Sequence, residues 1–143
     1  MKSESGGRVR VGLLGFGTVG RAFARLLIRE AADLSLRRGA NVSLVTVATR
    51  NAAQKRDASL GDGVRWTSDL ASVATDPECD VVVELLGGIE PANGLIRAAL
   101  TAGKSVVTAN KMLLARHGTA LQDLALEKGA GLGIEAAVAG GIP

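Results

Sequence analysis

Three glycines follow an apolar run in the stretch LLGFGTVGRAFARLL. Gly15, Gly17 and Gly20 have the spacing G-x-G-x-x-G. The apolar run, residues 8–14, predicts a buried β-strand, and apolar residues at helical spacing follow from Val19 onward. A strand, a glycine-rich turn and a helix in this order are the context in which such a spacing binds a dinucleotide. This stretch therefore favours folds built around a parallel sheet.

Each glycine is expected to have its own role in such a turn. Gly15 permits the tight turn out of the strand, Gly17 lets a pyrophosphate approach the backbone, and Gly20 lets the helix pack close to the sheet. The N-terminus of the helix offers free N–H groups and a partial positive charge to phosphate. The alternative is that the glycines serve packing only. The residues expected to contact the cofactor here are Gly15, Phe16, Gly17, Thr18, Val19 and Gly20.

The rest of the chain alternates between strand-like and helix-like segments. This alternation predicts right-handed βαβ units and an α/β fold, a doubly wound parallel sheet of the Rossmann type. The polar segment 51–63 is expected to be a loop. After the strand at 8–14, strands are predicted at 41–49, 64–67, 80–88, 104–111 and from 131 onward. Helices are predicted over residues 19–39, 69–75, 91–103 and 111–128. Ser68 and Asp69 can cap the second of these helices, and Gly39 and Gly129 are expected to end the first and the last.

The two ends of the chain differ in character. Residues 1–7 are polar and predict a disordered tail, without the apolar segment of a signal peptide. Residues 8–143 are expected to form a single NAD(P)-binding domain, since a chain of 143 residues suits one core. The last residues give a strand, a glycine pair and Pro143, which indicates a fragment or the first domain of a longer protein.

Composition argues against two classes of partner. The formal net charge is only +3, and the chain has one Trp and no Tyr, so we expect no nucleic-acid partner. No apolar run approaches the ~18 residues of a membrane-spanning helix, so we expect no membrane partner and a cytoplasmic location. Arg21, Arg25 and Arg29 are interpreted as the water-facing stripe of their helix. Cys79 is the single cysteine and is expected to be inert.

The end of the second predicted strand bears on the choice of nicotinamide cofactor. NAD sites usually place Asp or Glu there for the ribose hydroxyls, but this chain has Thr49, Arg50 and Asn51. Arg50 can pair with a 2′-phosphate, and Lys55 or Arg56 can add a second charge. NADP is therefore the expected cofactor, with NAD as the alternative. The other interpretation of these cations is that they solvate a loop.

Two further segments are expected at the same edge of the sheet. The carboxyl ends of parallel strands face the crevice in which a doubly wound sheet binds its cofactor. Gly87 and Gly88 end one strand and leave room for the nicotinamide ribose, and Asn110 and Lys111 follow the next strand. A lysine at a helix start is disfavoured by the helix dipole, so its place there favours a functional role. His117 falls on the apolar row of its helix, which predicts a packed or rim histidine and not a catalytic one.

The motifs GFGTVG, ELLGG, VVTANK and EAAVAGGIP occur in this order over residues 9–143. In this order and spacing they resemble the amino-terminal half of homoserine dehydrogenase. The resemblance implies an NAD(P)-dependent interconversion of L-homoserine and L-aspartate 4-semialdehyde, on the route to threonine, methionine and isoleucine. It also implies a small-molecule substrate and a homo-oligomer for the full-length protein.

The same resemblance implies roles for particular residues. Lys111 would contact both the nicotinamide end and the substrate, where an ammonium group can polarise a carbonyl or relay a proton. The segment EAAVAGGIP resembles the family's site for a monovalent cation, usually sodium, and oxygen ligands suit such a hard ion. The alternative is a turn between domains. The implied ligands are Glu135, by side chain or backbone, and the backbone carbonyls of Val138, Gly140 and Ile142.

The chain departs from the family's pattern because it stops before the substrate domain, which carries the principal acid/base lysine. We therefore expect this chain alone to bind cofactor but to turn over little or no homoserine. Two other interpretations stay open: another NAD(P)-linked oxidoreductase of related fold, and a non-catalytic NAD(P)-sensing module. The first would more often have a lysine–proline pair where this chain has Lys111 and Met112.

Overall fold

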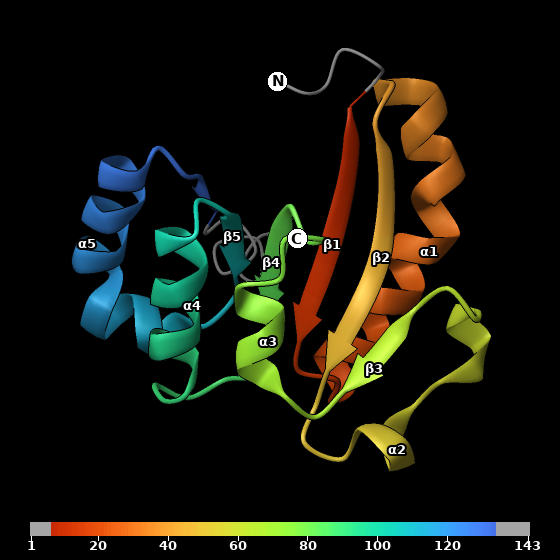
Figure 1. Ribbon diagram of the computed structural model, residues 1–143, viewed down its shortest axis with the longest axis horizontal. Coiled ribbons are helices and arrows are strands. Elements are labelled where there is room, and N and C mark those ends of the chain that lie inside the picture. The colour runs from red at the N-terminus through yellow and green to blue at the C-terminus, as the bar shows by residue number, and fades with distance from the viewer. Residues whose placement is uncertain (1–6, 134–143) are drawn as a thin grey trace.

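The strands of the computed structural model, which describes residues 7–133, form one parallel sheet (Figure 1). It has six strands in the order β3-β2-β1-β4-β5-β6, and every hydrogen-bonded pair is parallel. The predicted α/β fold is therefore confirmed. The strands are β1 (Arg8–Leu14), β2 (Asn41–Ala48), β3 (Arg65–Thr67), β4 (Val81–Glu84), β5 (Ser105–Thr108) and β6 (Leu132–Gly133). The α-helices are α1 (Thr18–Arg38), α2 (Ala52–Lys55), α3 (Leu70–Ala74), α4 (Ala92–Thr101) and α5 (Lys111–Lys128).

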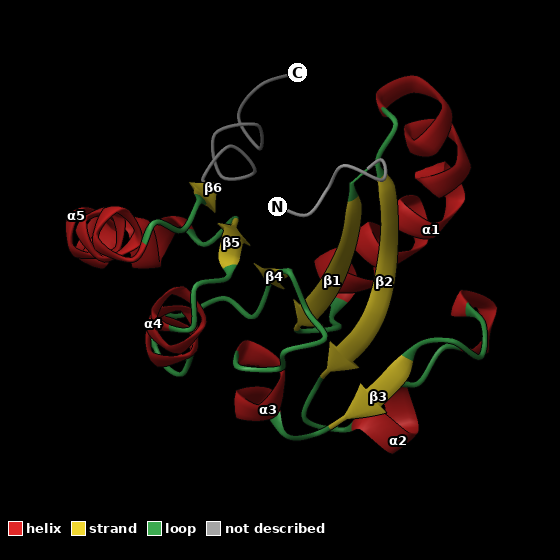
Figure 2. Cartoon of the chain, turned by 45° about the horizontal axis from the view of Figure 1, so that its top comes forward, coloured by secondary structure: helices red, strands yellow, loops and turns green. Residues whose placement is uncertain are grey.

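The sheet is doubly wound about β1. The chain proceeds outward from β1 through β2 to β3, returns to β4 on the other side of β1, and proceeds through β5 to β6. Because such crossovers are right-handed, the two halves carry their helices on opposite faces. Figure 2 shows α1 on one side of the sheet and α3, α4 and α5 on the other. The carboxyl ends of β1 and β4 form the switch point at which such a sheet binds its ligand.

The second half of β1, residues 11–14, is buried on both faces because it lies in the middle of the sheet. Leu13 and Leu14 are both 0% exposed, yet they belong to different clusters of the hydrophobic core. Leu14 belongs to the cluster that includes Ile96 of α4, and Leu13 to the cluster that includes Ala24 of α1. The near-continuous apolar sequence of β1 is thus explained by helices on both faces.

Capping residues explain where several helices begin and end. Gly39 and Gly129 follow α1 and α5 with a left-handed backbone, φ 66° at both, as the sequence predicts. Asp69 begins α3 by accepting a backbone N–H in its side chain, and Asn110 begins α5 in the same way. These local signals place the helix ends within a residue or two of their predicted positions.

Several local features differ from the sequence prediction. The strands predicted at 80–88 and 104–111 end earlier, at Glu84 and Thr108, because Gly87 and Gly88 turn the chain with positive φ and Asn110 caps α5. The segment 51–63, predicted as a loop, contains α2 and the short 3-10 helix η1 (Ala58–Leu60), neither long enough to show a helical period. Val19, predicted in the apolar row of α1, is 61% exposed because it lies in the first turn, where it borders a cavity. Gly7, predicted in the tail, accepts a hydrogen bond from the Asn41 N–H at 3.0 Å.

Among the helices of residues 7–133, none combines the length and the apolar character that a membrane crossing requires.

Candidate functional site

Gly15 turns the chain out of β1 in a backbone conformation that favours glycine. Its φ is 103°. Its N–H donates to the Ala48 carbonyl oxygen at 2.9 Å, at the end of β2. A Cβ atom at Gly15 would lie 2.8 Å from the Leu85 carbonyl oxygen, just beyond β4. The turn is therefore packed between the ends of β2 and β4, and no side chain fits there.

Gly20 is tightly packed, whereas Gly17 borders open space. A Cβ atom at Gly20 would lie 2.2 Å from the Gly15 carbonyl oxygen, so close packing is confirmed, although the contact is with the glycine turn itself. A Cβ atom at Gly17 would have no heavy atom within 4 Å. The space beside Gly17 is thus open to a ligand, as its predicted role requires.

The first turn of α1 is suited to an anion. Its N-cap residue is Gly17, so no capping side chain occupies the first N–H groups, and the first turn contains no acidic residue. An uncapped helix N-terminus that follows a glycine turn offers N–H donors and a partial positive charge to phosphate.

Phe16 lies between the first two glycines, and its side chain packs in the hydrophobic core. It is 1% exposed, and its ring meets that of Trp66 edge to face, with centroids 4.9 Å apart. The Arg21 guanidinium lies over the same ring, 4.9 Å from its centroid. A ligand in the glycine turn would therefore meet the backbone of Phe16, and Arg21 is held beside that turn.

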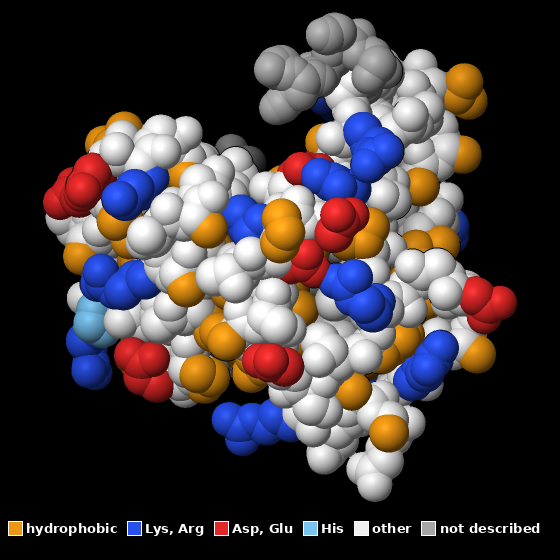
Figure 3. All heavy atoms as spheres, viewed as in Figure 1, with side chains coloured by type: hydrophobic (Ala, Val, Ile, Leu, Met, Phe, Trp, Pro, Cys, Tyr) orange, Lys and Arg blue, Asp and Glu red, His pale blue; other side chains and the backbone are white. Residues whose placement is uncertain are grey.

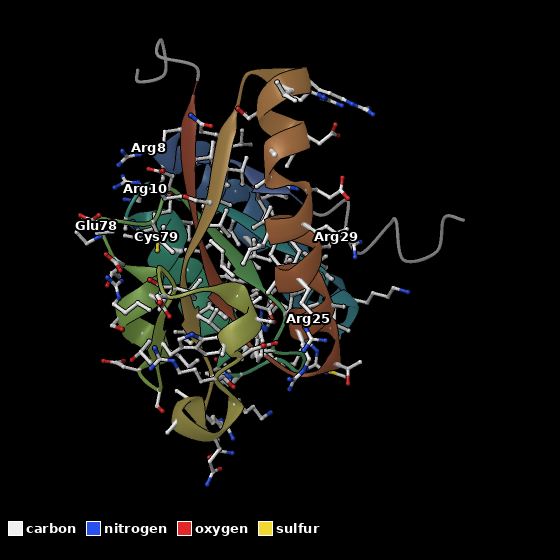
Figure 4. All side chains as sticks on the ribbon, turned by 90° about the vertical axis from the view of Figure 1, so that its right-hand side faces the viewer. Arg8, Arg10, Arg25, Arg29, Glu78 and Cys79 are labelled. Carbon is white, nitrogen blue, oxygen red and sulfur yellow. The ribbon has the colours of Figure 1, made fainter. Side chains whose placement is uncertain are left out.

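The interpretation of the α1 arginines as a water-facing stripe is wrong for Arg21, which is half-buried against Phe16. The Arg25 side chain is 53% exposed, as predicted, and it also donates to the Asp57 carboxylate at 2.8 Å. Two donors on Ser59, and then Arg25, lower the pKa of Asp57 to about 2. Arg29 is exposed as predicted, and Figure 4 shows it on α1 with Arg25. The Arg25–Asp57 pair ties the β2–β3 connection to α1, a contact between residues 32 positions apart.

A cavity of 160 Å³ lies where the start of α1 meets the ends of β4 and β5. Val19 lines it from α1, Gly87 from the segment after β4, and Asn110 from the start of α5. Three segments that the sequence analysis assigned to the cofactor site therefore meet at one place. The full lining is Val19, Glu84, Leu85, Gly87, Ala109 and Asn110.

Gly87 and Gly88 both adopt backbone conformations that favour glycine, with φ of 81° and 75°. A Cβ atom at either position would have no heavy atom within 4 Å. The turn after β4 therefore requires glycine at both positions. The absence of side chains there leaves open space beside the cavity.

Glu84, the last residue of β4, is a site residue that sequence reasoning missed. It is 0% exposed and lines the cavity. Its carboxylate accepts the N–H groups of Leu86 and Gly87, and it contacts the side chains of Thr108 and Asn110. The available signal was a single acid within the apolar run VVVELL. A buried acid needs such partners.

Lys111 is the first residue of α5 and is exposed, directly after the cavity-lining Asn110. Its predicted place beside the crevice agrees with this geometry.

Arg50 is exposed and lies two residues beyond Ala48, whose carbonyl oxygen accepts the N–H of Gly15 in the glycine turn. Lys55 ends α2 and Arg56 follows it, on the connection that Asp57 ties to α1.

The two residues predicted to have no catalytic role, His117 and Cys79, have the expected surroundings. His117 is half-buried on α5. Cys79 is 2% exposed; burial, and then the negative charge of Asp76, raise the pKa of its thiol. The four predicted cation ligands, Glu135, Val138, Gly140 and Ile142, lie outside the described residues.

Charged side chains do not gather by sign on the face seen in Figure 3. Basic and acidic groups are interspersed there, over both halves of the sheet. Within residues 7–133, no group of three or more His, Cys, Asp and Glu side chains could hold a metal ion.

Comparison with known proteins agrees with this geometry. Residues 15–135 match the family model "Homoserine dehydrogenase, NAD binding domain". The homoserine dehydrogenase of Pseudomonas aeruginosa is 44% identical over 135 residues, which are 94% of this chain and 30% of that protein. That of Bacillus subtilis is 39% identical over 135 residues, 94% of this chain and 31% of that protein. The chain thus spans about a third of the length of these relatives.

Solved structures show the same relationship. A homoserine dehydrogenase from Thiobacillus denitrificans superposes with a TM-score of 0.82 at 42% identity, over 91% of this chain and 30% of that one. A hyperthermophilic archaeal homoserine dehydrogenase in complex with NADPH gives a TM-score of 0.72 at 25% identity, over 91% of this chain and 44% of that one. The fold, the glycine turn and the sequence matches agree, and the chain belongs to the homoserine dehydrogenase family, matching its NAD-binding domain.

Proposed function

We propose that this chain is the NADP(H)-binding part of a homoserine dehydrogenase that interconverts L-homoserine and L-aspartate 4-semialdehyde in threonine, methionine and isoleucine biosynthesis. The observation that carries the proposal is the meeting of the open glycine turn with the cavity at the ends of β4 and β5. The archaeal relative solved with NADPH supports the choice of ligand. The domain extends over residues 8–143.

The pyrophosphate binds at the glycine turn, against the first turn of α1. Gly17 offers open space, and the backbone N–H groups from Thr18 to Gly20 offer donors without a competing side chain. Arg50, beyond the end of β2, pairs with the 2′-phosphate, and Lys55 or Arg56 adds a second positive charge. NAD, which lacks that phosphate, then binds more weakly.

The nicotinamide end lies at the cavity beside Gly87, Gly88 and Lys111. A bound nicotinamide supplies or accepts a hydride. The ammonium group of Lys111 polarises the substrate carbonyl or relays a proton at its oxygen. The principal acid/base group belongs to the substrate domain of the family, so the chain alone binds cofactor with little or no turnover.

For the longer protein we also propose a small-molecule substrate, a homo-oligomeric state and a cytoplasmic location, as befits a biosynthetic dehydrogenase. The sodium site at Glu135, Val138, Gly140 and Ile142 stays a prediction from the family resemblance.

Titration with NADPH and, separately, with NADH tests the proposal through nicotinamide fluorescence. We expect NADPH to bind about tenfold tighter or more, because a charge-assisted contact with the phosphate contributes about 1.5–3 kcal/mol. Equal affinities would remove the role of Arg50. A folded chain that binds neither cofactor would overturn the proposal.

A further inference from the structure

We propose that Glu84 is a positioning residue for the nicotinamide end of the site. Its buried carboxylate joins the segment after β4 to the start of α5, and so fixes Gly87, Gly88 and Lys111 relative to one another. This inference rests on the proposed NADP(H)-binding function, because it assigns what aligns one half of that cofactor.

One side of the link is the segment after β4. The Glu84 Oε2 atom accepts the N–H of Leu86 at 2.9 Å and the N–H of Gly87 at 3.1 Å. Two consecutive glycines with positive φ give this segment wide conformational freedom. The Glu84 carboxylate therefore restricts the conformation of a segment that would otherwise be flexible because of its two glycines.

The other side of the link is the end of β5. The Thr108 hydroxyl accepts the Asn110 N–H at 3.1 Å, so its own hydrogen points to Glu84 Oε1, 2.5 Å away. The Asn110 side-chain Nδ2 atom lies 3.4 Å from Glu84 Oε2. All four partners of the carboxyl group are donors, so both of its oxygens act as acceptors.

Asn110 extends the link to α5. Its Oδ1 atom accepts the Leu113 N–H at 3.1 Å and so caps the helix that Lys111 begins. Its Nδ2 atom also donates to the Gly88 carbonyl oxygen at 2.5 Å. One amide therefore holds the helix start, the glycine pair and Glu84 together.

The location of these contacts favours a role in the site over a general role in the fold. A buried charge is destabilising unless it is fully hydrogen-bonded, and an apolar side chain is the simpler choice in a buried strand. Every partner of Glu84 lies at the carboxyl-end edge of the sheet, around the cavity. None of the ion pairs found within residues 7–133 includes Glu84.

Asn110→Ser and Glu84→Gln test the inference, with two ligands as probes. Serine keeps a helix-capping oxygen but removes both Nδ2 contacts. Glutamine keeps the shape of Glu84 but replaces one acceptor oxygen with an NH2 donor, so at least one of the four contacts is reversed or lost. NADPH reaches both halves of the site, whereas 2′,5′-ADP reaches only the adenosine half. Asp69→Ser, the same kind of change at the N-cap of α3, is the matched control.

We expect Asn110→Ser and Glu84→Gln to weaken NADPH binding about tenfold, a loss typical of one or two hydrogen bonds to a charged group, and to leave 2′,5′-ADP binding unchanged. The fluorescence of bound NADPH should shift toward that of the free cofactor, because the nicotinamide is less well held. Asp69→Ser should bind both probes as the wild type does.

Other results overturn the inference. NADPH affinity that stays at the wild-type value in both variants refutes it, and so does an equal loss for both probes. Thermal unfolding and 2′,5′-ADP binding report whether each variant folds. If Glu84→Gln does not fold, the NADPH affinity of Asn110→Ser alone tests the inference. A wild-type chain that binds neither probe refutes the proposed function itself, whereas normal wild-type binding with unchanged variants refutes only the role of Glu84.

Discussion

The backbone of Gly20 lies directly against the carbonyl group of Gly15, so that a Cβ atom at position 20 would stand 2.2 Å from the Gly15 oxygen. Five residues apart in the chain, the two glycines close the turn on itself. Gly17, between them, borders open space. The motif therefore contains two glycines required by the fold, Gly15 and Gly20, and one available to a ligand, Gly17.

Gly20→Ala and Gly17→Ala should separate these two roles. Gly20→Ala forces a contact with backbone and should lower the free energy of unfolding by about 3 kcal/mol or more. Gly17 has a φ of −85°, which alanine adopts, so Gly17→Ala should keep its stability and lose NADPH binding. Urea unfolding and a fluorescence titration measure the two effects. Equal stability losses in the two variants, or normal NADPH binding by Gly17→Ala, would contradict this division.

Arg50→Ala should weaken NADPH binding about tenfold or more and leave NADH binding unchanged, because only NADPH carries the 2′-phosphate. Arg29→Ala, a loss of the same charge from an exposed position on α1, is the control for long-range electrostatics. A similar loss in both variants would assign the effect to net charge and not to a phosphate contact.

Asp57→Asn should change how stability depends on acid. The folded pKa of Asp57 is about 2 against an ordinary 3.8, chiefly because Ser59 donates two hydrogen bonds and then because of Arg25. A lowered folded pKa means that the contribution of Asp57 is fully present above pH 3.8 and is lost as the pH falls toward 2.

Urea unfolding across that pH range measures this contribution. Near neutral pH, Asp57→Asn should be less stable than the wild type, and the difference should shrink as the pH falls through the range. Asp62→Asn, on the exposed part of the same connection, is the control. A difference that stays constant with pH would show that Asp57 acts by shape alone.

Cys79 should not react with a thiol reagent near neutral pH in the folded chain. It is 2% exposed, and burial raises the pKa of its thiol, which lowers the amount of the reactive thiolate. In urea, one thiol per chain should react, since the sequence has one cysteine. Rapid modification of the folded chain would show that the loop before β4 opens readily.

Local patterns predicted much of the fold. The glycine turn, the alternation of strand and helix, and the caps at Gly39, Asp69 and Gly129 depend on neighbouring residues and were confirmed. Arg50 and Lys111 stay predictions, although the structure gives both a position that fits their roles. The short helices α2 and η1 were missed because a single turn has no period to detect.

The amino-acid sequence alone was sufficient for the α/β fold class and the glycine turn, because strand periodicity, turn residues and caps act over a few positions. The interior of the site depended on contacts between distant positions. Glu84 and Asn110 are 26 residues apart, and Arg25 and Asp57 are 32 apart. Such pairs meet only when the strand order and the parallel register bring the carboxyl ends of β4 and β5 together, or lay the β2–β3 connection against α1. No local propensity encodes that arrangement, since it results from packing the whole sheet.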